Sequence, residues 1–157
     1  MQKYFKVAKA ARAKYPDIKL LGPVPANEWQ WYNWSGGSKI NGVHYPWLEF
    51  FIKRIAEEEQ ASGIKLLDVL DIHFYPGTSD AAQSLQLHRV YFDRTYNYPD
   101  ANGVRTIKGG WDTSITKEYI LGRCSDWLVK YMGADHGVGL AVTETDIASS
   151  NANIQAL

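Results

Sequence analysis

Residues 138–146 read VGLAVTETD, a short apolar run that stops at Glu144 between two threonines. A run of this kind is typical of a strand that is buried on both faces of a parallel sheet. In α/β barrels, such strands present their functional side chains at the carboxyl end. The stretch therefore predicts a buried strand that carries an acidic group to one edge of a sheet.

Two earlier stretches repeat this pattern. Residues 66–72 read LLDVLDI and lead into His73 and Tyr75, and residues 18–22 read IKLLG and lead into a segment that contains Glu28. The carboxyl ends of parallel strands meet at one edge of a sheet, so we expect these side chains to share one site. This arrangement is typical of an enzyme.

Helical periodicity separates the predicted strands, and the segments after strands are long whereas those after helices are short. Helices are predicted over residues 3–14, 47–61 and 115–132, with a short helix near 80–92. The long segments are 24–41, which is predicted to be a loop, and an insertion over 77–114. Right-handed crossovers then place three parallel strands side by side. The order predicts an α/β fold, part of a (β/α)8 TIM barrel.

A closed barrel needs eight strands and usually about 250 residues. We therefore expect residues 1–157 to be an incomplete segment of one barrel domain, with about three βα units. A self-sufficient three-stranded domain is the alternative.

The composition excludes several classes of partner. Seventeen basic residues balance seventeen acidic ones, so the chain lacks the basic excess that nucleic acids and anionic membranes demand. No apolar run approaches the roughly 20 residues that span a bilayer, and residues 1–6 lack the apolar segment of a signal peptide. The single cysteine cannot form an internal disulfide, and the four histidines are scattered rather than at metal-ligand spacing. We expect no metal and no cofactor.

Aromatic residues make up 13% of the chain. Four tryptophans lie in segments that are also rich in glycine and asparagine: Trp29, Trp31, Trp34 and Trp111. Their rings could stack on pyranose faces in a substrate cleft, or some of them could cover the core.

Glu144 is the strongest candidate for chemistry. A carboxylate flanked by Thr143 and Thr145 can be held ionised by hydroxyl and backbone donors, which suits a nucleophile at an anomeric carbon. The alternative is a strand-terminal glutamate that serves a neighbouring helix end. His73 and Tyr75 alternate along their strand and point to the same side. Tyr75 could donate to Glu144, and His73 could bind a substrate hydroxyl, tune protonation or be a core histidine.

Glu28 follows an asparagine after the first predicted strand, which is a common position for the acid/base of a retaining glycosidase. Such enzymes need two carboxyl groups about 5–5.5 Å apart, on strands that have two others between them. Only one convincing strand separates Glu28 from Glu144. We therefore interpret Glu28 as a substrate-site or loop-anchoring residue, with the acid/base role as the alternative.

Five motifs in order resemble glycoside hydrolase family 44, over nearly all of the chain. They are 21–24, the tryptophan-rich segment after it, 68–76, 87–94 and 141–144. The family comprises retaining endoglucanases and xyloglucanases with a TIM barrel and a β-sandwich domain. The resemblance implies that residues 22–23 end barrel strand five, that His73 and Tyr75 end strand six, and that Glu144 is the nucleophile at the end of strand seven.

The family acid/base is the glutamate of an Asn-Glu-Pro motif after strand four, and this sequence contains no such tripeptide. The resemblance implies an endo-β-1,4-glucanase that acts on cellulose- or xyloglucan-type β-glucan through a covalent glycosyl-enzyme on Glu144. Because this substrate is a polymer, we expect the protein to be extracellular, and we expect a monomer when the chain is complete. The segment alone, without its acid/base, would be inactive. Two alternatives stay open: a non-catalytic carbohydrate-binding domain, and a barrel hydrolase acting on mannan or xylan.

Overall fold

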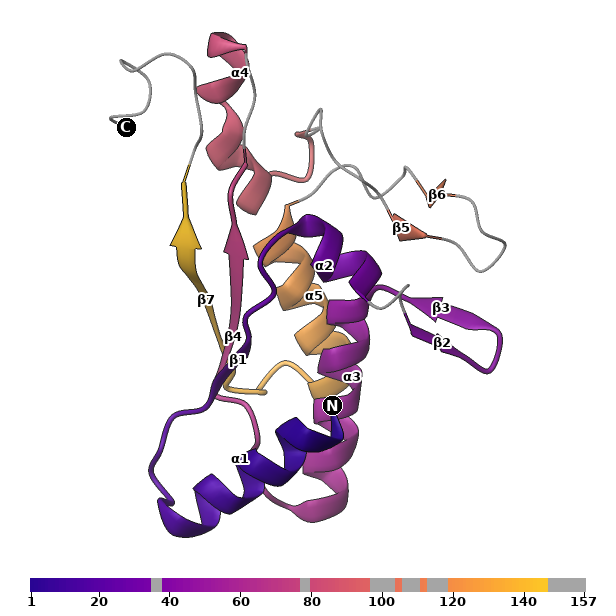
Figure 1. The fold of residues 1–157 in the computed structure, drawn as a ribbon, viewed down its shortest axis with the longest axis vertical. Helices are drawn as coiled ribbons and strands as arrows, with labels where there is room; N and C mark the ends of the chain where they lie inside the picture. Colours follow the sequence, from indigo (N-terminus) through magenta and orange to yellow (C-terminus); the bar gives the residue numbers. More distant parts are fainter. Residues whose placement is uncertain (35–37, 77–79, 97–103, 106–110, 113–118, 147–157) are drawn as a thin grey trace.

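Three parallel strands form the centre of the molecule. The computed structural model describes residues 1–34, 38–76, 80–96, 104–105, 111–112 and 119–146. Within these ranges the central sheet has the order β1-β4-β7, from β1 (Leu21–Pro23), β4 (Val69–Phe74) and β7 (Gly139–Thr145). The strands lie side by side with helices on one side (Figure 1). The prediction of an α/β fold with three neighbouring parallel strands is confirmed. The prediction that the last strand is buried on both faces was wrong: every residue of β7 is exposed or half-buried, because β7 is an edge strand of the described sheet.

The long helices lie close to their predicted positions. They are α1 (Gln2–Lys14), α3 (Trp47–Ser62) and α5 (Ile120–Met132). Gly63 ends α3 with a φ of 67°, and its N–H donates to the carbonyl of Glu59, the glycine stop that left-handed backbone favours. The predicted helix start at 115 falls outside the described residues. No described helix is long and apolar enough to cross a membrane.

The segment 24–41, predicted to be a loop, contains regular structure, so that prediction was wrong. The Asn27 side chain accepts a hydrogen bond of 3.1 Å from Gln30 N–H and begins α2 (Glu28–Asn33). An antiparallel hairpin follows, formed by β2 (Ser38–Ile40) and β3 (Val43–Tyr45). Its two-residue turn has positive φ at Asn41 and Gly42, as Asn-Gly hairpin turns require.

The second long segment also carries short elements. The predicted helix near 80–92 is divided into α4 (Ala81–Ser84) and the 3₁₀ helix η2 (Leu87–Tyr91). Beyond it, β5 (Val104–Arg105) and β6 (Trp111–Asp112) pair in an antiparallel ribbon.

The core lies between the sheet and the helices α2, α3 and α5 (Figure 1). Alternate residues of β4, namely Leu70, Ile72 and Phe74, point to this layer and are at most 1% exposed. Asp71 and His73 therefore lie on the opposite face of the sheet. This face is not covered by the helices, so it is the one that can present side chains to a ligand.

Asp68 fixes the amino-terminal end of the sheet. Its carboxylate accepts hydrogen bonds from Leu20 N–H at 2.9 Å and from Arg12 Nη2 at 2.7 Å. Burial alone would raise the pKa of Asp68, but these bonds and the charges of Arg12 and Lys65 outweigh burial and lower it. The network ties α1 to both β1 and β4.

Candidate active site

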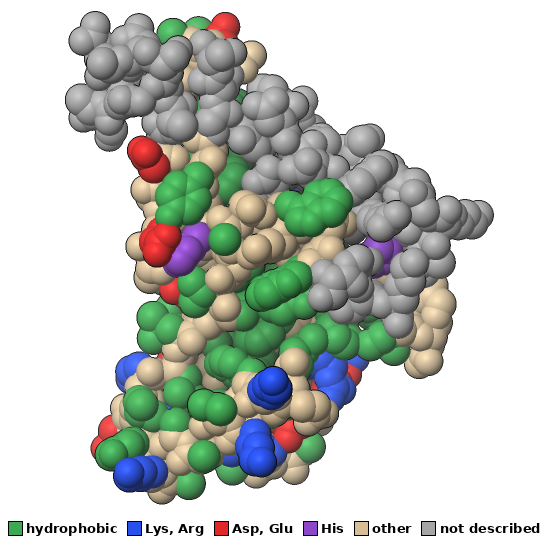
Figure 2. Space-filling view, viewed as in Figure 1, with side chains coloured by type: hydrophobic (Ala, Val, Ile, Leu, Met, Phe, Trp, Pro, Cys, Tyr) green, Lys and Arg blue, Asp and Glu red, His purple; other side chains and the backbone are tan. Residues whose placement is uncertain are grey.

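The carboxyl ends of β4 and β7 bring Glu144, His73 and Tyr75 together. His73 and Glu144 are register partners, and His73 Nδ1 lies 3.3 Å from Glu144 Oε2. The Tyr75 hydroxyl donates a hydrogen bond to the same oxygen. In Figure 2, acidic and histidine side chains lie next to each other on the left flank, where β7 lies in Figure 1. Three of the four residues expected to share one site are therefore in contact, and the side chain of the fourth, Glu28, lies outside the described part of the structure.

A bulge in β7 makes this arrangement possible. Ile72 pairs with Val142, whereas the next residue, His73, pairs with Glu144, so Thr143 is an extra residue in β7. In a regular register Glu144 would lie opposite Phe74, whose side chain is buried on the helix side. A shift of one residue moves a side chain to the other face of a sheet. The bulge therefore turns Glu144 to the same face as His73.

Asp71 holds the bulge. Its Oδ1 accepts from Thr143 N–H at 3.2 Å and its Oδ2 accepts from the Thr143 hydroxyl at 2.8 Å. The Thr143 hydroxyl oxygen also lies 3.1 Å from His73 Nε2. Asp71 was not among the predicted site residues. One sequence feature could have identified it: Asp71 is a charged residue inside an apolar strand, two positions before His73. A charge buried in this way needs hydrogen-bond or ionic partners.

The three side chains differ in exposure. The Glu144 side chain is 57% exposed and that of His73 is 15% exposed, while Tyr75 is 49% exposed. A ligand can therefore reach Glu144 and Tyr75 from the open face of the sheet. The hydrogen bond to Glu144 raises the pKa of Tyr75, since it stabilises the protonated phenol. Tyr75 is thus held as a donor to the carboxylate.

Trp31 was predicted to be one of the sugar-binding tryptophans, and the structure contradicts this prediction. It is fully buried in α2, and its ring centroid lies 4.7 Å from that of Phe74. A ring without an exposed face cannot stack on a ligand, so its role is in the core. Trp29 and Trp34 are 44% and 41% exposed and keep accessible surface.

Two further predicted residues are only partly described. Glu28 is the first residue of α2 and Trp111 begins β6, but both side chains lie outside the described part of the structure. Among the described residues, no group of three or more histidine, cysteine, aspartate or glutamate side chains could hold a metal ion.

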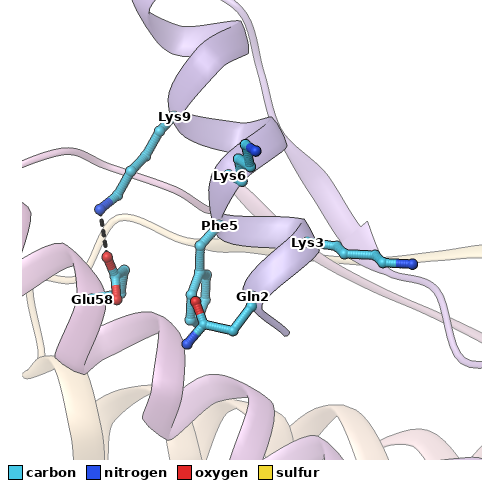
Figure 3. A pocket seen from close by; sticks show the side chains of 6 residues that line it. All are labelled: Gln2, Lys3, Phe5, Lys6, Lys9 and Glu58. Carbon is cyan, nitrogen blue, oxygen red and sulfur yellow. Dashed lines mark hydrogen bonds and ion pairs between the residues drawn. The ribbon is translucent and has the colours of Figure 1, made fainter.

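Other hollows lie elsewhere on the surface. One, of about 320 Å³, is lined by aromatic and apolar side chains around the end of β1, including Trp34, Trp47 and Phe51. Another, of about 350 Å³, lies between α1 and α3 and contains three lysines, of which Lys9 is paired with Glu58 (Figure 3). The hollow at α1 lies at the end of the molecule opposite to the carboxyl ends of the strands (Figure 1). It is therefore separate from the Glu144 site.

Comparison with known proteins confirms the resemblance to family 44. Residues 1–78 match the family model of glycoside hydrolase family 44. Solved structures with a similar fold include Cel44A, a family 44 endoglucanase from Clostridium thermocellum (23% identity, TM-score 0.70), and a family 44 xyloglucanase from Paenibacillus polymyxa (20% identity, TM-score 0.72). In both cases the match covers 92% of this chain and 30% of the solved chain.

A curated relative, the beta-mannanase/endoglucanase A of Caldicellulosiruptor saccharolyticus, is 21% identical over 173 residues. That match covers 96% of this chain and 13% of the relative. The chain thus spans about 30% of the length of the solved structures and a smaller share of the curated relative. Its fold corresponds to one part of the larger family 44 structures.

Proposed function

Residues 1–78 belong to glycoside hydrolase family 44, and from this premise we propose that the chain is part of the TIM-barrel domain of a retaining endo-β-1,4-glucanase. Its substrate is a β-glucan of the cellulose or xyloglucan type. The observation that carries the proposal is the contact of Tyr75 and His73 with Glu144 at the carboxyl ends of two neighbouring parallel strands. In barrel enzymes, the catalytic groups lie at this end.

In the proposed reaction, Glu144 is the nucleophile. One carboxylate oxygen attacks the anomeric carbon while the bond to the leaving sugar breaks, and a glycosyl ester forms. Water then hydrolyses this ester and releases the sugar with retained configuration. Tyr75 and His73 both contact Oε2. We assign the attack to Oε1, because the Tyr75 hydrogen bond occupies Oε2 and fixes the orientation of the carboxylate.

A second carboxyl group must protonate the leaving oxygen, about 5–5.5 Å from the nucleophile. The family supplies it from an Asn-Glu-Pro motif, which is absent from these 157 residues. We expect it from sequence outside this chain, so the isolated segment should not hydrolyse β-glucan. Turnover by the purified segment would instead assign the acid role to Glu28.

The test is hydrolysis of soluble β-glucan by the full-length protein and by its Glu144→Gln variant. The amide keeps the size of the side chain but is a poor nucleophile, so turnover should fall by several orders of magnitude while oligosaccharide binding is retained. Glu57→Gln on α3 is a matched control and should keep normal turnover. Near-normal hydrolysis by Glu144→Gln would refute the nucleophile assignment. Binding without hydrolysis by the unaltered full-length protein would favour a carbohydrate-binding domain.

Mannan is a second candidate substrate, because one relative is named a beta-mannanase/endoglucanase. Xylan is a third, because a structural neighbour is named a bifunctional glucanase-xylanase. Initial rates on purified cellulose, xyloglucan, mannan and xylan separate these substrates. Because all four are insoluble or large polymers, we also propose that the protein acts outside the cell. We further propose that it acts as a monomer. Secretion into the medium and the mass in solution test these two points.

A further inference from the structure

The hydrogen bonds around Thr143 determine where the protons of His73 lie. The Asp71 carboxylate can only accept, and it takes both the N–H and the hydroxyl proton of Thr143, at 3.2 Å and 2.8 Å. A hydroxyl has one proton to donate. Since that proton is directed at Asp71, the Thr143 oxygen can only accept from His73 Nε2, 3.1 Å away.

This places a proton on His73 Nε2. In the neutral ring Nδ1 is then unprotonated, and Nδ1 is the nitrogen that faces Glu144 Oε2 at 3.3 Å. A second proton on the ring can therefore be added only at Nδ1, where it would be donated to Glu144. Without that proton the contact joins two acceptors, because the Glu144 carboxylate, like that of Asp71, can only accept.

We propose that Asp71 and Thr143 are positioning residues that fix His73 as its Nε2–H tautomer, so that Nδ1 faces the nucleophile. The inference rests on the proposed function for its catalytic meaning. The same two residues hold the bulge that turns Glu144 toward His73. Asp71 itself is 3% exposed, so its carboxylate is shielded from water, whereas Thr143 and its contact with His73 lie at the exposed face.

The direct test is the tautomer of His73, read from side-chain ¹⁵N NMR shifts of the ¹⁵N-histidine-labelled full-length protein at a pH where the ring is neutral. The unaltered protein should carry the proton on Nε2. In Asp71→Asn the amide oxygen must face Thr143 N–H, so the amide nitrogen donates to the Thr143 hydroxyl. The hydroxyl proton is then free for Nε2, and the tautomer should change to Nδ1–H.

Two variants of Thr143 complete the series. Thr143→Val removes the acceptor and should abolish the preference for Nε2–H, whereas Thr143→Ser keeps the hydroxyl and should keep the preference. Thr145→Val is the matched control, because the Thr145 hydroxyl contacts Tyr91 at 2.6 Å rather than His73. An Nδ1–H tautomer in the unaltered protein would overturn the inference. So would an unchanged Nε2–H tautomer in both Asp71→Asn and Thr143→Val.

Kinetics give a second measurement. Asp71→Asn should lower kcat on β-glucan by about 10- to 100-fold with little change in KM, as expected when a catalytic group is misplaced. Thr143→Ser should restore most of the rate that Thr143→Val loses. The tautomer is measured without turnover, so its failure is distinct from failure of the hydrolase assignment, which the Glu144→Gln variant tests. Unaltered kcat in Asp71→Asn would overturn the catalytic part of the inference.

Discussion

His73 and Glu144 lie opposite each other on β4 and β7, with 3.3 Å between Nδ1 and Oε2. The pairing depends on the extra residue Thr143, which shifts the register by one. Glu144 therefore shares a face with His73 and Tyr75 and is turned away from the apolar helix layer. The proposed role of Glu144 as nucleophile depends on this arrangement.

Removal of the Tyr75 hydroxyl should impair turnover without loss of stability. Tyr75→Phe deletes the donor to Glu144, and we expect kcat to fall by about 10²-fold, as for other donors to charged catalytic groups. The free energy of unfolding should change by less than about 0.5 kcal/mol, because Tyr75 is half-exposed. Tyr15→Phe, on another exposed tyrosine, is the control. Equal kcat in both variants would show that the Tyr75 contact has no catalytic part.

The pKa of Tyr75 should depend on Glu144. The hydrogen bond to the carboxylate, and next to it burial and the negative charge of Glu144, raise this pKa. Glu144→Gln removes the charge and weakens the bond, so the pKa of Tyr75 should decrease. Titration of ¹³C-labelled tyrosine by NMR measures it, with Tyr15 as internal reference. A pKa that stays the same in the variant would mean that the contact is absent in solution.

Trp31 and Trp29 should behave differently although both belong to α2. Trp31→Ala removes a fully buried ring and should cost about 3–5 kcal/mol of unfolding free energy. Trp29→Ala should cost less than about 1 kcal/mol, because Trp29 is nearly half-exposed. If Trp29 stacks on sugar, its variant should raise KM roughly 2- to 10-fold. Urea unfolding and steady-state kinetics separate the two effects, and equal stabilities would contradict the assignment of Trp31 to the core.

Asp68 should contribute to stability only above acidic pH. Its pKa is lowered in the folded protein, so its contribution is complete above the unfolded pKa of about 3.9 and is lost as pH falls through the folded value. Asp68→Asn should lower the free energy of unfolding at pH 7 by about 2–4 kcal/mol, since Arg12 loses its carboxylate partner and keeps only its hydrogen bonds to backbone carbonyls. The exposed Asp135→Asn is the control. A difference between Asp68→Asn and the unaltered protein that does not shrink on acidification would contradict this account.

The sequence predicts the order of elements well but the strand boundaries less well. The predicted strand 66–72 is observed at 69–74, because Leu66 and Leu67 are buried without belonging to the strand. The Glu59 carboxylate accepts from both of their N–H groups, at 2.6 Å and 3.1 Å. Hydrophobicity reports burial, whereas strand assignment depends on which partner the backbone N–H finds.

The candidate site was predictable only where it depends on local sequence patterns. Alternation along one strand places His73 and Tyr75 on one side, and parallel pairing brings Glu144 to them. The bulge at Thr143 depends on register between two distant segments, so no local pattern reveals it, and the partners of Asp71 could not be predicted. The burial of Trp31 could not be predicted, because α2 is only six residues long and too short for periodicity to show which of its rings faces the core.

The most direct measurement is covalent trapping of the nucleophile. The full-length protein is incubated with a 2-deoxy-2-fluoro-β-cellobioside that carries a good leaving group, digested and analysed by peptide mass spectrometry. The account predicts one glycosyl adduct, on Glu144, and none in Glu144→Gln. An adduct on a different carboxylate, or undiminished labelling of Glu144→Gln, would contradict it.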